Sequence, residues 1–146
     1  MDYISVKEFL KQPKEVQKVL LDWWKPEVGD VYCSLYNNNQ PDNVMVINQC
    51  QFGLTIFKED IKKYGIPLLT EGQLRQFIED ETQGKMDILV NGIGITNEYI
   101  GYEFMCWSSV DQCKYKKEYS FRVDAKDLLE AYWVVAILII KGCKNS

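Results

Sequence analysis

The sequence predicts an α+β fold: a mostly antiparallel sheet with three to four helices, and a C-terminal helix central in the core. Two patterns predict it. Apolar residues recur at helical spacing in three parts of the chain, and between them lie segments rich in β-branched and aromatic residues. The composition is 47% hydrophobic, which suits a packed core, and no linker or repeat interrupts the 146 residues. One domain over 1–146 is therefore expected.

Two short helices are expected first. Ser5 and Glu8 have the S-x-x-E spacing of a capping box, and Pro13 suits the first turn of a second helix, "PKEVQKVLLDWW". Within that helix one apolar face is predicted, made of Val16, Val19, Leu20 and Trp23.

A β segment should follow. "DVYCSLY" and "VMVINQC" flank the turn-rich "NNNQPDN", which predicts a hairpin. If Tyr36 pairs with Val44 in this hairpin, Cys33 lies opposite Ile47. "FGLTIF" at 52–57 suggests a third strand.

The second half begins with the clearest helix, "TEGQLRQFIEDETQG", in which Thr70 is the predicted N-cap and Gly84 the stop. Three β segments, "MDILV", "YIGYEFMCW" and "EYSFRV", come next. Asp124 is then predicted to cap a final helix over 125–141.

That final helix contains an uninterrupted apolar run from 131 to 140. Ten helical residues rise about 15 Å, half of a bilayer core, so the run predicts a buried helix rather than a membrane span. Two readings stay open: the helix is enclosed within one chain, or its extra face meets a second subunit in a homodimer.

The net charge and the cysteines indicate which cellular compartment and which classes of partner to expect. The net charge of −4 argues against general nucleic-acid binding and against attraction to an anionic membrane. The first residues, "MDYISVKEFLKQPKE", carry no apolar signal core, and none of the five cysteines forms a C-x-x-C pair. A cytoplasmic protein with free thiols is expected.

The chain has no histidine. This removes the commonest general base, the Ser-His and Cys-His pairs and the usual catalytic zinc ligands. "NGIGITN" at 91–97 fits neither a dinucleotide fingerprint nor a phosphate loop. We therefore expect no enzyme activity, no cofactor and no metal.

Two groups of residues are candidates for binding. Glu79, Asp80 and Glu81 stand where a helix dipole disfavours negative charge, and Trp24 falls off the apolar stripe of its helix, so both suit contact with a basic protein partner. The plainer readings are a solvated helix face for the carboxylates and a rim-of-core position for the tryptophan.

The second group is Trp107, Lys114, Tyr115 and Lys116. Aromatic rings beside ammonium groups can stack on a base and contact a phosphate, as a small nucleotide ligand requires. A charged turn or a protected edge strand explains the same residues without any ligand.

Three blocks of sequence carry a resemblance: "QPKEVQKVLLDWWKPEVGD" at 12–30, "IPLLTEGQLRQFIED" at 66–80 and "DLLEAYWVVAILI" at 127–139. In their order and in their residues they resemble a family of short, uncharacterised phage and prophage proteins of low-GC Gram-positive anaerobes. No activity is assigned to that family, so no functional residues carry over. The resemblance implies a phage accessory protein that acts inside a bacterial host and binds a host protein, in host takeover or anti-defence.

Overall fold

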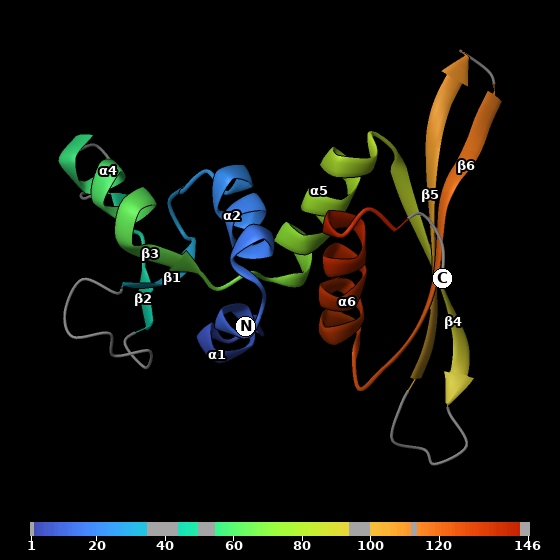
Figure 1. Ribbon diagram of the computed structural model, residues 1–146, viewed down its shortest axis with the longest axis horizontal. Coiled ribbons are helices and arrows are strands. Elements are labelled where there is room, and N and C mark those ends of the chain that lie inside the picture. Colours follow the sequence, from blue (N-terminus) through green and yellow to red (C-terminus); the bar gives the residue numbers. More distant parts are fainter. Residues whose placement is uncertain (1, 35–43, 50–54, 94–99, 112–113, 144–146) are drawn as a thin grey trace. The chain divides into compact units, whose positions relative to one another are not determined.

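A computed structural model of the chain (Figure 1) describes residues 2–34, 44–49, 55–93, 100–111 and 114–143. These residues group into two compact units, Tyr3–Leu69 and Thr70–Ser146 together with Met1–Asp2. Each unit contains helices and a small antiparallel three-stranded sheet, which confirms the α+β class.

The Tyr3–Leu69 unit contains helices α1 (Val6–Leu10), α2 (Lys14–Trp23) and α4 (Thr55–Tyr64), and strands β1 (Val31–Ser34), β2 (Val44–Val46) and β3 (Gly65–Pro67). The strand order is β2-β1-β3. As the sequence predicts, the Ser5 side chain caps α1 by accepting from the Glu8 amide, and α2 begins directly after Pro13.

The hairpin register differs from the prediction. Val44 pairs with Cys33 rather than with Tyr36. The strand is anchored further along, where the Ile47 amide donates to the Asp30 carbonyl at 3.0 Å. Ile47 is buried in a core cluster with Trp24, Tyr32 and Ile61. The burial of Ile47, and not a preference for the shortest turn between the strands, therefore fixes the register.

The strand suggested at 52–57 is also wrong where it can be checked, because Thr55 already begins α4. A short apolar run fits a strand or a helix equally well by periodicity, and the helix-forming residues after it decide for the helix. The helix ends at Tyr64. At the next residue, Gly65, a Cβ atom would lie 2.5 Å from the Ile61 carbonyl oxygen, so only glycine fits.

The Thr70–Ser146 unit has two layers. Its elements are α5 (Glu71–Thr82), β4 (Lys85–Ile93), β5 (Ile100–Asp111), β6 (Lys114–Ala125) and α6 (Leu128–Ile140). The sheet has the order β4-β5-β6, and α5 and α6 lie side by side on one face of it (Figure 1). Phe121, Val123 and Ala125 of β6 are buried, whereas Arg122 and Asp124 between them are exposed.

The final helix lies in the core of this unit, where it packs on α5, β5 and β6. Its cap is Asp127 and not Asp124, because β6 continues through Ala125 and the Asp127 side chain accepts from the Glu130 amide. Its buried residues are Ala131, Tyr132, Trp133, Val135, Ala136 and Ile137. Val134 and the last turn are only half-buried, so burial is not complete all round. Within the described part of the chain, no helix has both the length and the apolarity to cross a membrane.

Candidate functional site

Helix α5 positions the predicted carboxylates. Thr70 accepts from the Gln73 amide, and the Gln73 side chain accepts from the Thr70 amide, which completes a capping box at the helix start. The rotation of the helix is fixed by its buried side chains, Leu74, Phe77, Ile78 and Thr82. Residues 79–81 therefore occupy the last turn, with Glu79 half-buried and Asp80 and Glu81 exposed.

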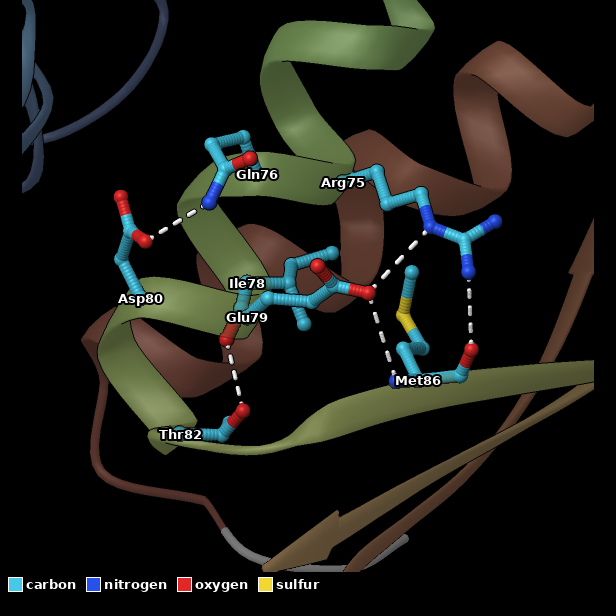
Figure 2. A network of polar contacts seen from close by, with 7 residues as sticks. All are labelled: Arg75, Gln76, Ile78, Glu79, Asp80, Thr82 and Met86. Carbon is cyan, nitrogen blue, oxygen red and sulfur yellow. Dashed lines mark hydrogen bonds and ion pairs between the residues drawn. The ribbon is translucent and has the colours of Figure 1, made fainter.

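Glu79 is used by the fold. Its Oε1 accepts from Arg75 Nε at 3.3 Å and from the Met86 amide at 3.4 Å, while Arg75 Nη2 donates to the Met86 carbonyl at 3.1 Å (Figure 2). The Glu79 side chain is only 14% exposed. This closed set of contacts joins the end of α5 to β4, so Glu79 is a connecting residue and not a free acid.

Asp80 and Glu81 remain on the surface. Asp80 Oδ1 accepts from Gln76 Nε2 at 2.8 Å, one turn earlier on the same helix (Figure 2). The helix ends at Thr82 because the next residue, Gln83, adopts a left-handed conformation, with φ 53°. Two exposed carboxylates therefore stand next to the carbonyl end of α5, where the helix dipole disfavours them.

The second candidate group lies on the β5–β6 hairpin. The register pairs Trp107 with Lys117, Ser108 with Lys116 and Ser109 with Tyr115. The register also places Lys114 opposite Asp111. The side chains from 107 to 118 lie outside the described residues, so only this backbone placement is established.

Within the Thr70–Ser146 unit, the end of α5 and Trp107, the first residue of the second group, lie at the same end of β4. Lys85, the first residue of β4, pairs with Trp107 of β5. Lys85 follows the end of α5 by three residues. The exposed carboxylates of α5 are therefore only a few residues before Lys85, where β4 begins. Beyond the Lys85–Trp107 pair, only β5 and β6 continue among the described strands of this sheet.

Trp24 does not belong to an exposed site. It is 2% exposed, its Nε1 donates to Asp30 Oδ2 at 2.9 Å, and the Lys62 ammonium lies 5.9 Å from its ring centroid. The predicted exposure was wrong because the helix ends at Trp23. Trp24 is extended, with ψ 121°, so its side chain does not follow the helical period.

Burial governs the acid–base chemistry near the Glu79 contacts. It raises the pKa of the Cys106 thiol to about 11; a hydrogen bond with Thr82 lowers that pKa, and the Glu79 carboxylate raises it. Burial also raises the pKa of Tyr132, whereas the adjacent Arg75 lowers it. Both groups are protonated at neutral pH, and neither is an activated nucleophile.

Across the described ranges, no three Cys, Asp or Glu side chains gather closely enough to hold a metal ion. The connecting role of Arg75 was not predicted, although its i,i+4 spacing to Glu79 in the sequence was a usable signal. Comparisons of the chain with family models, with curated proteins and with solved structures find no match.

Proposed function

We propose that this chain is a non-enzymatic phage accessory protein that binds a protein of its bacterial host, in host takeover or anti-defence. The observation that carries the proposal is the exposed pair Asp80 and Glu81 in the last turn of α5. Charges in that position destabilise their own helix slightly, and residues that cost the fold something locally are candidates for a role in binding.

The chemistry of this surface favours a basic partner. Two neighbouring exposed carboxylates attract lysine and arginine side chains, and they chiefly increase the rate of association at low salt. Glu79 contributes no contact of its own in this proposal, because Arg75 and the Met86 amide already occupy it. Its role is to hold the end of the helix against β4.

The test is charge reversal with a matched control. We expect Asp80→Lys/Glu81→Lys to fold normally and to associate with the captured host protein more slowly, by on the order of tenfold at low salt. Asp87→Lys/Asp124→Lys is the control, since both residues are exposed in the same unit and the change in net charge is identical. Stopped-flow or surface-based kinetics separate a local effect from a general one. Equal rates for the two double variants contradict the proposal.

The alternative function is binding of a small nucleotide. The observation that favours it is the β5–β6 register, which places Trp107, Tyr115 and Lys116 within one short stretch of paired backbone. Titration with mono- and dinucleotides, followed by tryptophan fluorescence, distinguishes the two functions. A saturable change that is lost in Trp107→Phe and Lys116→Ala favours the nucleotide, and a flat titration favours the protein partner.

A further inference from the structure

A second surface lies in the Tyr3–Leu69 unit, at strand β2. Its three residues, Val44, Met45 and Val46, are all exposed, and Val46 is the most exposed of them at 57%. β2 is at one end of the strand order β2-β1-β3, and among the described residues no strand pairs with its outer side. Edge strands of soluble proteins are usually protected by charge, proline or a bulge. Residues 44–49 read "VMVINQ" and contain no charged residue and no proline.

The hydrogen bonds around β2 show which of its peptide groups point outward. The Ile47 amide donates to the Asp30 carbonyl, so the peptide groups of Ile47 face β1. Because this orientation alternates along an antiparallel strand, the groups of Met45 also face β1. The groups of Val44 and Val46 therefore face the open edge.

The hydrogen bonds between β1 and β3 also indicate that the peptide groups of Met45 face β1. The Leu68 amide donates to the Val31 carbonyl at 2.9 Å, so the peptide groups of Val31 face β3. Those of Tyr32 must then face β2, where Tyr32 is paired with Met45. Pro67, which has no N–H to donate, lies opposite Tyr32 on the β3 side, as this alternation requires.

We propose that the occupant of this edge is β2 of a second copy of the chain, paired antiparallel about a two-fold axis at Met45. Such pairing places Val44 opposite Val46 of the second copy, and Val46 opposite its Val44. Both residues present their peptide groups outward, so each of these pairs can exchange two hydrogen bonds. The strand is also chemically compatible with a second copy of itself, because pairing the two copies brings no like charges together.

The size of the surface sets the strength of this contact. Stable dimers commonly bury about 1,200–2,000 Å² of total surface, more than a three-residue strand can supply. The dimer is therefore weak and sensitive to dilution, and it joins the two sheets into one six-stranded sheet. β2 and the carboxylates of α5 belong to different units, and the inference does not depend on the proposed function.

The experiment compares oligomeric state in matched variants. Sedimentation or light scattering of the wild-type chain, from about 1 mM to about 10 µM, should show a dimer that dissociates on dilution. Val46→Lys should weaken dimerisation at least tenfold, because it places two added charges on the shared edge. Val28→Lys is the control, since Val28 is 50% exposed in the same unit but outside the strands.

Val46→Pro gives a second variant that spares the monomer. The Val46 N–H faces the open edge, so proline removes no bond to β1 but removes bonds to the second copy. Amide exchange in the wild-type chain provides a readout without substitution: protection of the Val44 and Val46 amides should rise with protein concentration. A chain that stays monomeric throughout, or a dimer weakened equally by Val46→Lys and Val28→Lys, overturns the proposal. In that case the occupant of the β2 edge would be a strand of another protein.

Discussion

At Cys106 the side chain is enclosed between β5 and the end of α5, and the fold favours its neutral form. Burial is the main cause of its raised pKa, and the Glu79 carboxylate adds to the effect. A group whose pKa is higher in the folded state stabilises the fold below the pKa of the unfolded chain. That contribution is lost as the pH rises through the folded-state value.

The resulting prediction concerns alkaline pH. Between the ordinary thiol value of 9.0 and the folded value of about 11, the free energy of unfolding should fall by about 2 kcal/mol through this group alone. Urea unfolding at pH 7.5 and at pH 10.5 measures the fall, and Cys106→Ala should show a correspondingly smaller one. An identical fall in both proteins would assign the alkaline instability to other groups, such as the tyrosines.

At the scale of single elements, the sequence predicts well wherever a local signal decides the structure. The Ser5 and Thr70 caps and the helix after Pro13 are all confirmed. Each depends on residues within one or two turns of one another. The register at Val44 was predicted wrongly, because the long-range burial of Ile47 decides it. The segment at Thr55 was predicted wrongly as a strand, because a short apolar run fits a strand or a helix equally well by periodicity.

The candidate site was likewise predicted only where local sequence signals decide its structure. The position of Glu79–Glu81 at the end of a helix followed from the sequence. That Glu79 is half-buried and bonded across to β4, whereas Asp80 and Glu81 are exposed, depends on Arg75 and on the Met86 backbone. Trp24 was misplaced because a helix boundary moved by a single residue changes the direction of a side chain completely.

The cap of α6 tests this boundary argument directly. Asp127 Oδ1 accepts from the Glu130 amide at 2.8 Å, whereas Asp124 is an exposed residue of β6. Asp127→Ala should lower the free energy of unfolding by about 1 kcal/mol, the usual cost of losing an N-cap. Asp124→Ala should change it by less than about 0.5 kcal/mol. Chemical denaturation of both variants gives the comparison, and the reverse order of effects would return the cap to Asp124.

At the scale of the whole molecule, the two proposed surfaces belong to different units: β2 to Tyr3–Leu69, and Asp80 and Glu81 to Thr70–Ser146. Substitutions that share no partners usually have additive effects. We therefore expect Val46→Lys to weaken dimerisation at least tenfold without changing the association rate of each subunit with a host protein. Asp80→Lys/Glu81→Lys should slow that association and leave the dimer intact.

Combining the substitutions decides whether the surfaces act separately. The combined variant should dimerise as weakly as Val46→Lys and should bind as slowly as the double variant alone, because neither change alters a contact that the other uses. Light scattering and binding kinetics, measured on the same samples at one salt concentration, give both values. If Val46→Lys alone also removes host-protein binding, the host protein recognises the dimer, and the carboxylates act as part of one larger surface that only the paired chains complete.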